Sequence, residues 1–463
     1  MIAPDLTQAI PDDLGRVHFI GIGGSGMSGI ARLFHARGLT VTGSDRSESA
    51  TITALRALGI EVQIGHEPAL VTSANTVVVT GALWDDNPEY AWALEHDIPV
   101  LHRSLALHWL TRTGRVIAIA GAHGKTTSTA MVVTALRGVG ADPSFVNGGV
   151  IASLGVSADV GRDSEFVIEA DESDGSFLLY TVAIGLITNI DTDHLETYGS
   201  MDAFDDAFVT FANGCSETVV VSSDDAHLER LRPRITATTI SFGEDAAADV
   251  RVTDIAATST GVTATVHHGN EREALVLSVA GRHNATNATG AIAVLIAMGY
   301  SLGAAATALA AFAGTGRRFE LNGECRGVRV FDDYAHHPRE VRAALATARS
   351  VVGDGRVIAI HQPHLYSRTR DMAGEFAAEY EMGADFTVVL DVYGAREDPI
   401  AGVTGELVSS AFTDSDRVAY CPDWTDAARV AAEYAKDGDI IMTLSCGDVY
   451  RIIPHVLSAL ETS

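Results

Sequence analysis

The chain is poor in basic residues and almost lacks lysine. It has 32 basic against 60 acidic residues, for a formal net charge of −28 over 463 residues. Such a charge repels nucleic acid and anionic membranes, so we expect neither as a partner. Only Lys125 and Lys436 are lysine, and every other basic residue is arginine. The lysine within GAHGKTT therefore indicates that a compact ammonium group is needed at that position.

Cysteine is also scarce. The four cysteines, Cys215, Cys325, Cys421 and Cys446, are far apart in sequence and form no C-x-x-C pair. This spacing argues against a disulfide framework and against a cysteine-based zinc site. It favours reduced thiols in a cytoplasmic protein.

Long hydrophobic runs and a signal-like N-terminus are missing as well. Residues 1–15 are acidic and lack the basic and apolar segments of a signal peptide. Residues 290–316 contain no ionisable group except Tyr300, but they are mostly alanine. Gly299 and Ser301 interrupt them with a helix stop and a helix start. We expect two short buried helices there instead of a membrane span.

Strand-like apolar runs alternate with helical patterns along nearly the whole chain. This alternation is typical of α/β domains with parallel sheets. Breaks near residues 111–114 and 314–316 predict three α/β domains, over residues 1–112, 113–316 and 317–463. Short runs rich in valine and threonine predict a β-rich part between residues 218 and 277.

The first strand-like run leads into the glycine-rich loop GIGGSGMSGIA. Gly21, Gly23 and Gly26 have the G-x-G-x-x-G spacing that brings backbone amides close to a diphosphate at a helix N-terminus. Asp45 follows the next strand, where an acid would hold the ribose of NAD. The motif suits any diphosphate, and it also suits a tight turn that binds nothing.

A second loop, GAHGKTT, follows the apolar run RVIAIA and opens a helical run. It departs from the general Walker pattern G-x-x-x-x-G-K-[ST], because Ile119 stands at the position of the first glycine. We expect the amides of residues 121–127 to cradle β- and γ-phosphates and Lys125 to neutralise them. The Thr126 hydroxyl would bind Mg²⁺, so the sequence predicts a nucleoside triphosphate site.

Acids and a histidine follow two further strand-like runs. Glu169 ends FVIE, and Asp191 and His194 follow GLITNI. Such positions face the ligand crevice of a parallel sheet, and Mg²⁺ prefers oxygen ligands. Beside a phosphate loop we assign Glu169 and His194 to the metal, and we leave Asp174 and Asp191 open.

Polar motifs also mark the last third of the chain. GRHNATNAT presents His283 and Asn287 together with Asn284, which suits a helix N-cap equally well. GRRFE places Arg317 and Arg318 after the second break, and DDYAHHP and HQPHLYSRT each follow a strand-like run. The paired histidines of these two motifs do not indicate zinc, because proline lies within both and no cysteine is nearby.

Together these motifs resemble the Mur ligase family of cell-wall enzymes. GIGGSGMSGIA, GAHGKTT, EADESDGSF, NIDTDHLE, GRHNATNA, GTGRRFE, DDYAHHP and QPHLYSRT occur in the family's order, nearly from end to end. The first motif resembles the one found in a particular branch of the family. That branch joins L-alanine to the lactyl carboxylate of UDP-N-acetylmuramate in peptidoglycan precursor synthesis.

The resemblance implies a Rossmann-like UDP-binding domain, a central P-loop ATPase-type domain with a small β-rich part, and a C-terminal Rossmann-like domain. It also implies a cytoplasmic ligase, monomeric or dimeric, that uses ATP and Mg²⁺. Such a ligase forms its amide through an acyl phosphate and releases ADP and phosphate. The first loop would then hold the UDP diphosphate and the second loop ATP, and no nicotinamide would be needed.

The resemblance also implies roles for individual residues. Catalytic roles would fall to Lys125, Glu169, His194, Arg317 and His336. Nucleotide contacts would come from Gly121, Ala122, His123, Gly124, Lys125, Thr126, Thr127, His283, Asn287, Arg317 and Asp333. The sugar-nucleotide would meet Gly21, Gly23, Gly24, Ser25, Gly26, Met27, Ser28, Tyr334, His336 and Arg368, and Mg²⁺ would meet Thr126, Glu169 and His194.

The chain departs from the family pattern at two places. Leu365 stands where the family has a second arginine, and Ser445 and Cys446 stand where glycine or alanine is usual. Three alternative functions are a relative that attaches whole peptides to UDP-N-acetylmuramate, a nicotinamide dehydrogenase, and a non-catalytic nucleotide-binding regulator. The N-terminal loop argues against the first, and the second phosphate loop argues against the dehydrogenase.

Overall fold

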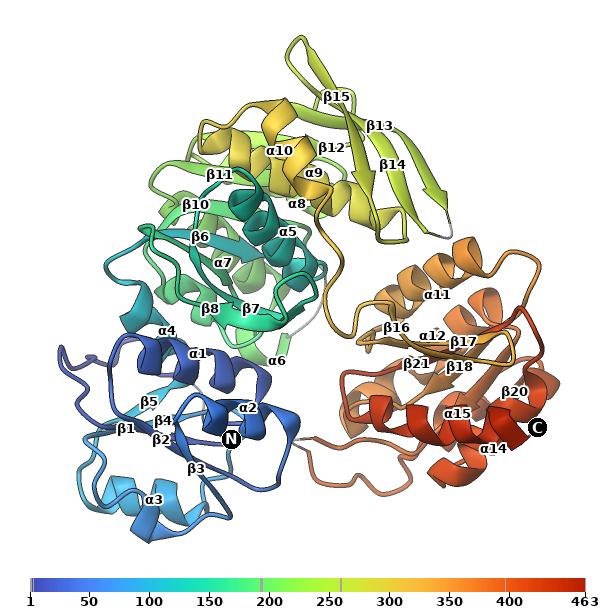
Figure 1. Ribbon diagram of the computed structural model, residues 1–463, viewed down its shortest axis with the longest axis horizontal. Helices are drawn as coiled ribbons and strands as arrows, with labels where there is room; N and C mark the ends of the chain where they lie inside the picture. Colours follow the sequence, from blue (N-terminus) through green and yellow to red (C-terminus); the bar gives the residue numbers. More distant parts are fainter. Residues whose placement is uncertain (1, 3, 192–194, 259, 396, 463) are drawn as a thin grey trace. The chain divides into compact units, whose positions relative to one another are not determined.

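The structure, a computed structural model, describes residues 2, 4–191, 195–258, 260–395 and 397–462 (Figure 1). The chain forms two compact units. The first comprises Met1–Thr253, Thr265–Leu275 and Thr286–Ala313, and the second comprises Asp254–Ala264, Val276–Ala285 and Gly314–Ser463. Three sheets, each with its own helices, form the predicted three-domain α/β architecture. The domain boundaries at residues 112/113 and 316/317 stay predictions.

The first sheet has five parallel strands in the order β3-β2-β1-β4-β5. Its strands are β1 (Val17–Ile20), β2 (Val41–Asp45), β3 (Glu61–Ile64), β4 (Thr76–Val79) and β5 (Val100–His102). The helices between and after them are α1 (Ser25–Ala36), α2 (Ala50–Ala57), α3 (Pro88–Glu95) and α4 (Arg103–Thr111). The strand order reverses between β1 and β4, and ligands bind at such a switch point, beyond the carboxyl ends of the strands. The glycine-rich loop directly follows β1.

The second sheet has ten strands in the order β15-β14-β13-β12-β11-β10-β6-β9-β7-β8. Its first strands are β6 (Arg115–Ala120), β7 (Ser144–Ile151), β8 (Val156–Asp159), β9 (Glu165–Glu169) and β10 (Val182–Ile187). The remaining strands are β11 (Thr218–Ser222), β12 (Thr239–Gly243), β13 (Val250–Thr258), β14 (Gly261–His268) and β15 (Glu271–Leu277). The predicted β-rich part thus consists of β11 to β15 with one short helix, and it continues the central sheet.

The helices of this region are α5 (Lys125–Gly138), α6 (Leu195–Tyr198), α7 (Met201–Gly214), α8 (Ala226–Leu231), α9 (His283–Ala297) and α10 (Leu302–Leu309). Strand β6 pairs in parallel with β9 on one side and with β10 on the other. The carboxyl ends of these three strands therefore lie side by side. The second phosphate loop follows β6, Glu169 ends β9, and Asp191 follows β10.

The uncharged segment near residue 300 forms the two helices predicted for it. Helix α9 ends at Ala297, Gly299 has a φ of +93°, and the Ser301 side chain accepts a hydrogen bond from the Ala304 amide to begin α10. Both helices bury alanine and leucine. In the described parts of the chain, every helix is too short or too polar to cross a membrane.

The third sheet has six strands in the order β16-β17-β21-β18-β19-β20, with β16 and β17 antiparallel and the others parallel. Its strands are β16 (Glu320–Cys325), β17 (Val328–Asp333), β18 (Val357–His361), β19 (Phe386–Val389), β20 (Val418–Tyr420) and β21 (Ile440–Leu444). Its helices are α11 (Pro338–Val352), α12 (Tyr366–Gly383), α13 (Glu406–Ser410), α14 (Trp424–Tyr434) and α15 (Ile453–Thr462). Loops that lead to predicted site residues follow β17 and β18, and the loop after β21 carries Ser445 and Cys446, where the chain departs from the family pattern.

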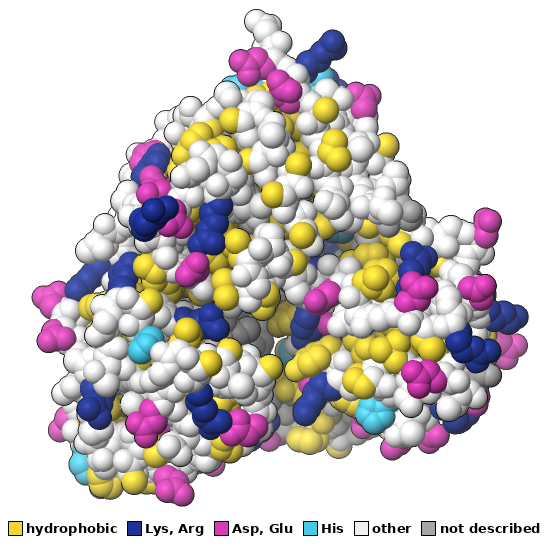
Figure 2. Space-filling view, in the orientation of Figure 1, with side chains coloured by type: hydrophobic (Ala, Val, Ile, Leu, Met, Phe, Trp, Pro, Cys, Tyr) yellow, Lys and Arg dark blue, Asp and Glu magenta, His cyan; other side chains and the backbone are white. Residues whose placement is uncertain are grey.

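The surface mixes charges of both signs. In the face drawn in Figure 2, acidic and basic side chains are interspersed, with apolar side chains between them. The inner parallel strands of the central and third sheets are buried on both faces, as in the VIAIA of β6 and the IIMTL of β21. Continuous apolar strands of this kind are typical of parallel sheets covered by helices on both sides.

Candidate active site

The glycine-rich loop after β1 is shaped by backbone hydrogen bonds to the neighbouring strand. The amides of Gly21 and Ile22 both donate to the carbonyl of Ser44, at 2.9 and 3.0 Å. Gly21 has a φ of +78°, which only glycine adopts at low cost. Helix α1 begins at Ser25 after Gly24, so its first amides point out of the loop and can receive an anion.

Asp45 is engaged by this loop. Its Oδ2 accepts a hydrogen bond from the Gly23 amide at 2.8 Å. A Cβ atom on Gly23 would lie 2.8 Å from that oxygen and 3.2 Å from Ile52, so this glycine is required by packing inside the protein. The carboxylate that would hold a ribose in a dinucleotide enzyme here fixes the loop.

The other predicted residues of the first loop differ in exposure. Met27 and Ser28 are buried, and Met27 packs in the hydrophobic core. A buried side chain offers no surface to a sugar-nucleotide, so a contact from Met27 would come from its backbone. A Cβ atom on Gly26 would meet only Arg103, at 3.8 Å, so there is room beside Gly26 for a ligand. The Ser25 side chain lies outside the described residues.

The second loop is supported by the residues that follow β10. The Thr188 hydroxyl and the Asn189 side-chain amide both donate to the His123 carbonyl, at 2.7 and 2.9 Å. Asn189 Oδ1 accepts from the His123 amide, and the Asn189 carbonyl accepts from the Ala122 amide. A Cβ atom on Gly121, whose φ is +128°, would lie 2.2 Å from the Thr188 hydroxyl. The loop is thus preorganised by close packing.

Lys125 begins α5 and points back over the loop. Its Nζ donates to the carbonyls of Gly121 and Ala122, at 2.6 and 3.2 Å, and to Glu172 Oε1 at 2.8 Å. Burial would lower the pKa of Lys125, but the carboxylates of Glu172, Asp171 and Glu169 outweigh it and raise that pKa. The ammonium therefore stays charged where phosphates would bind.

Two of the predicted Mg²⁺ ligands touch each other. The Thr126 hydroxyl donates to Glu169 Oε1 at 3.0 Å, and the Gly148 amide donates to Glu169 Oε2 at 2.8 Å. A hydroxyl and a carboxylate oxygen beside a phosphate loop are the donors that a hard cation prefers, so these residues fit Mg²⁺. His194, the third predicted ligand, lies outside the described residues.

Asp191 and Asp174, whose roles the sequence leaves open, both have partners in the structure. His123 Nε2 lies 3.1 Å from Asp191 Oδ2, which places Asp191 beside the phosphate loop. Asp174 lies 3.7 Å from Arg103, and Asp171 Oδ2 accepts a hydrogen bond from the same guanidinium at 2.7 Å. Because Arg103 begins α4 and lies against Gly26, it connects the first loop with the acids that follow β9.

Asn287 and His283 lie one turn apart on α9. A Cβ atom on Gly124 would lie 2.9 Å from Asn287 Oδ1, so the predicted nucleotide-binding amide is in contact with the phosphate loop. His283 is the first residue of the helix and is exposed. Asn284 is not the N-cap, because α9 already begins at His283; its side-chain nitrogen donates to the Ala280 carbonyl at 2.7 Å.

In the second unit, the Arg317 guanidinium is bound to three groups of the protein, which its sequence motif does not predict. Its Nε donates to Asp332 at 2.8 Å, and its two terminal nitrogens donate to the carbonyls of Ser445 and Gly447, at 2.7 and 2.9 Å. The guanidinium thus clamps the loop after β21. Its predicted contact with the nucleotide stays a prediction.

Asp333, Tyr334 and His336 follow β17. Asp333 accepts hydrogen bonds from the amides of Phe319 and Ala335, both at 2.8 Å, and burial raises its pKa to about 6 despite nearby Arg318. His336 Nδ1 lies 3.0 Å from Glu340 Oε2 and 3.1 Å from the Tyr334 carbonyl. The ring therefore has a fixed orientation beside Tyr334.

The loop after β18 carries Leu365 and leads into Arg368. Leu365 is buried and has a φ of +71°, which is costly for a residue with a Cβ. Its side chain packs inside the domain. Arg368 lies in the first turn of α12 and is half-buried. The strained backbone at Leu365 thus sets the start of the helix that presents Arg368.

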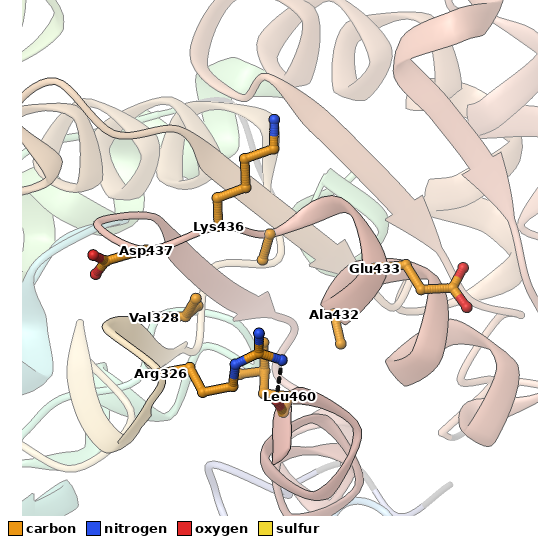
Figure 3. Close-up of a pocket in the computed structure, with 8 residues that line it drawn as sticks. Arg326, Val328, Ala432, Glu433, Lys436, Asp437 and Leu460 are labelled. Carbon is orange, nitrogen blue, oxygen red and sulfur yellow. Dashed lines mark hydrogen bonds between the residues drawn. The ribbon is translucent and has the colours of Figure 1, made fainter. Parts of the chain in front are cut away.

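A separate pocket of about 230 Å³ lies in the second unit. Its lining is Arg326, Val328, Ala432, Glu433, Ala435, Lys436, Asp437 and Leu460. In Figure 3 the Arg326 guanidinium points toward Leu460, whose carbonyl accepts its hydrogen bond at 3.3 Å. None of the predicted site residues lines this pocket, and we assign it no role.

Comparison with known proteins shows which family the chain belongs to. Three family models match consecutive segments: Mur ligase family, catalytic domain (residues 16–115), Mur ligase middle domain (residues 119–295) and Mur ligase, glutamate ligase domain (residues 317–447). The chain is 63% identical over 461 residues to the UDP-N-acetylmuramate–L-alanine ligase of Clavibacter michiganensis, which covers 100% of this chain and 97% of that protein. It is 45% identical over 458 residues to the enzyme of the same name from Cutibacterium acnes, with 97% of each chain covered.

Solved structures give the same result. The UDP-N-acetylmuramate–alanine ligase of Thermotoga maritima matches with a TM-score of 0.83 and 28% identity, over 96% of this chain and 99% of that one. A murein peptide ligase of Psychrobacter arcticus matches with a TM-score of 0.75 and 26% identity, over 97% and 99%. The fold and these matches define a three-domain ligase. The chain belongs to the Mur ligase family.

Proposed function

We propose that the protein is an ATP-dependent ligase that joins L-alanine to the lactyl carboxylate of UDP-N-acetylmuramate, in the cytoplasm and as a monomer or dimer. The single observation that carries the proposal is the full-length identity of 63% to a ligase with that name. The arrangement of the two loops supports it, because a sugar-nucleotide diphosphate and a triphosphate need separate anion sites. One loop follows β1 and the other follows β6.

In this proposal Lys125 exchanges the loop carbonyls and Glu172 for the β- and γ-phosphate oxygens of ATP. The amides of the second loop, held in place by Thr188 and Asn189, bind the same phosphates. The lactyl carboxylate attacks the γ-phosphorus, which gives an acyl phosphate and ADP, and the amine of alanine then displaces phosphate. The chain contributes mainly positioning and neutralisation of charge.

Thr126 and Glu169 would hold Mg²⁺, and His194 is the third proposed ligand. The Thr126–Glu169 contact of 3.0 Å supports their shared role. When bound, Mg²⁺ would neutralise charge on the phosphates. The Gly148 amide orients Glu169 by binding its second oxygen, so that its first oxygen faces Thr126.

His336, Tyr334 and Arg368 would meet the sugar-acid end of the substrate, while Arg317, Asp333, His283 and Asn287 would meet the nucleotide. For Asn287, the support is its contact with the phosphate loop at Gly124. For His336, it is the fixed orientation of the ring between Glu340 and Tyr334.

Phosphate release tests the proposal. Purified protein is given ATP and UDP-N-acetylmuramate and is titrated separately with L-alanine, glycine, L-serine and the peptide L-Ala-γ-D-Glu-meso-diaminopimelate. We expect release to saturate with L-alanine at the lowest concentration. Release that depends on the peptide instead would assign the protein to the peptide-attaching branch, and release without any amine acceptor would contradict an amide-forming ligase.

A further inference from the structure

A carboxylate that the proposed reaction does not use is buried close to the glycine-rich loop after β1. Glu89 lies in the first turn of α3 and is 0% exposed. His18 and Ser44, which contact it, are buried as well. A carboxylate is rarely buried in full unless hydrogen-bond donors surround it. The fold must therefore supply such donors around Glu89.

Four groups surround the Glu89 carboxylate. Oε2 accepts a hydrogen bond from the Ser44 hydroxyl at 2.6 Å and lies 3.1 Å from His18 Nε2. Oε1 accepts a hydrogen bond from the Glu67 amide at 3.1 Å and lies 3.3 Å from His66 Nδ1. An ionised carboxylate can only accept hydrogen bonds, so the two imidazole nitrogens that face it act as donors. Each oxygen thus has two donors.

These donors belong to three successive parts of the first sheet. His18 lies on β1, Ser44 lies on β2, and the other two donors follow β3. His18 is paired with Thr42 in the parallel register of β1 and β2, and its Nδ1 lies 2.9 Å from the Thr42 hydroxyl. Glu89 therefore joins three neighbouring parts of the sheet from the side on which α3 lies.

Ser44 connects this carboxylate with the glycine-rich loop. Its hydroxyl donates to Glu89, and its carbonyl accepts hydrogen bonds from the amides of Gly21 and Ile22, at 2.9 and 3.0 Å. The next residue of β2 accepts a hydrogen bond from the Gly23 amide at 2.8 Å. Two residues of β2 thus fix three successive amides of the loop, and Glu89 holds one of these two residues.

The segment after β3 is attached to the same end of β2. The Gly65 amide donates to the Asp45 carbonyl at 2.8 Å. The residues that follow, His66 and Glu67, contact Glu89 Oε1. Glu89 therefore contacts both the end of β2, which carries the loop, and the segment beside it.

Glu89 keeps its charge in these surroundings. Burial would raise the pKa of Glu89, but the hydrogen bonds from His18 and Ser44, together with the attraction of the two imidazoles, outweigh it and lower that pKa. Replacing buried ionic groups by apolar side chains of similar volume is often neutral for stability or even stabilising. The position that four directional contacts impose therefore explains this charge better than stability does.

We propose that Glu89 is a positioning residue for the binding of a nucleoside diphosphate: acting through Ser44, it fixes the loop after β1 and so the amides at the start of α1 that would receive the phosphates. Several N–H groups must point at one anion, so a small shift of the loop weakens all of these contacts together. The inference rests on the proposed function, which assigns the diphosphate of the sugar-nucleotide to this loop. Glu89 acts without touching the ligand.

Direct binding of UDP tests this role. Isothermal titration calorimetry compares the full-length wild type with Ser44→Ala and Glu89→Gln, in the absence of ATP. Ser44→Ala removes the hydroxyl that binds Glu89 and keeps the carbonyl that holds the loop. We expect the Kd for UDP to rise about tenfold in each variant, as for the loss of one hydrogen bond to a charged group. Glu95→Gln, at an exposed acid of the same helix, is the matched control and should bind UDP like the wild type.

Steady-state kinetics separates positioning from a general loss of structure. In Ser44→Ala and Glu89→Gln the KM for UDP-N-acetylmuramate should rise in parallel with the Kd for UDP. The kcat and the KM for ATP should stay within about twofold of the wild type, because the second loop lies on another sheet. An equal rise of both KM values, or a lower kcat with an unchanged KM for UDP-N-acetylmuramate, would overturn the positioning role.

The double variant tests whether the effect of Glu89 passes through Ser44. If it does, Ser44→Ala should add little to the loss already caused by Glu89→Gln, and losses that simply add would overturn the proposed route. If Glu89→Gln does not fold, Ser44→Ala decides alone. An unchanged Kd for UDP in the folded variants, with UDP bound by the wild type, would overturn this inference alone. A wild type that does not bind UDP would overturn the proposed function of the loop and the inference with it.

Discussion

At the residue scale, the phosphate loop is held by contacts that a nucleotide would replace. Lys125 binds two carbonyls of its own loop and Glu172, which is only 1% exposed. In the described part of the chain, Glu172 Oε2 has no hydrogen-bond partner. In the proposed function, Lys125 would turn to phosphate and Glu172 would lose its cationic partner. Phosphate binding would therefore break the buried Lys125–Glu172 contact, which an isolated motif does not reveal.

The first prediction concerns Lys125. The planar guanidinium of arginine cannot place a point charge among the Gly121 and Ala122 carbonyls and Glu172, so Lys125→Arg should be nearly as damaging as Lys125→Ala. We expect kcat to fall by orders of magnitude in both. Lys436→Arg is the control, since Lys436 is exposed and far along the chain. A Lys125→Arg variant that keeps more than roughly a tenth of wild-type kcat would refute the assigned role.

The second prediction is a pH dependence of stability that comes from Glu172. Burial raises its pKa from 4.5 to about 7, only partly offset by Lys125. A carboxyl group whose pKa is higher in the folded protein stabilises the fold below the unfolded pKa, and this contribution is lost as the pH rises through the folded pKa. The melting temperature of the wild type should therefore fall relative to that of Glu172→Gln between pH 5 and pH 8.

Thermal unfolding of both proteins at pH 5, 6.5 and 8 measures this difference. Glu48→Gln, at an exposed acid paired with Arg56, is the matched control and should track the wild type at each pH. A difference between wild type and Glu172→Gln that stays constant over the three values would contradict the raised pKa.

The third prediction concerns the carboxylate of the substrate. With Leu365 buried in place of a second arginine, the lactyl group should depend on Arg368. Arg368→Ala should weaken UDP-N-acetylmuramate binding by about 2–5 kcal/mol, because it leaves a partly buried carboxylate unpaired. Arg370 is the control: it is 53% exposed and pairs with Asp371. A loss below about 1 kcal/mol for Arg368→Ala would show that another cation binds the carboxylate.

At the scale of elements, each phosphate loop is a strand, a glycine turn and a helix, but the neighbouring strands complete it. The loop after β1 is tied to β2 through Ser44 and Asp45, and the loop after β6 is tied to the end of β10 through Thr188 and Asn189. At Gly23 and Gly121 a Cβ atom would lie 2.8 and 2.2 Å from atoms of the neighbouring segments. Substitutions in these loops should therefore act through the neighbouring strand as well as through the phosphates.

The fourth prediction uses this packing. A valine at position 23 would meet Asp45 and Ile52 and push the loop away from β2. Gly23→Val should raise the KM for UDP-N-acetylmuramate and leave the KM for ATP little changed, because the second loop lies on another sheet. Gly214→Ala, where a Cβ would meet nothing within 4 Å, is the control. Equal effects on both KM values, or measurable binding of NAD to the wild type, would count against a UDP loop.

The alternation of apolar strands and helices, the two loops and the interruption near Gly299 could all be predicted from the sequence, because each has a local signature. Thr188 and Asn189 could not, since a support residue for a loop 65 residues away has no motif of its own. The Arg103–Asp171 pair and the clamp that Arg317 forms on the β21 loop are equally non-local.

At the scale of the whole molecule, the scarcity of lysine limits the metal chemistry that the chain can use. Some ligases of the family bind a metal through a lysine carbamylated by CO₂. Lys125 is the one lysine between residues 113 and 316, and it is already bound to Glu172 and its own loop. Lys436 lies in an exposed segment after α14. A carbamate ligand is therefore chemically unavailable, and an anionic protein ligand to the metal must be a carboxylate.

The fifth prediction follows for Glu169. Glu169→Gln keeps the shape of the side chain but removes the anionic oxygen that faces Thr126, and a hard cation loses more from the missing charge than from any change in volume. We expect the Mg²⁺ concentration for half-maximal activity to rise in this variant. Glu165→Gln is the matched control, because Glu165 lies on the same strand and pairs with Arg115 instead.

Since carbamates decompose at low pH, the activity of the wild type at low pH should not respond to added bicarbonate. An unchanged Mg²⁺ requirement in Glu169→Gln would remove Glu169 from the metal site, whereas rescue by bicarbonate would show that a lysine carbamate forms after all.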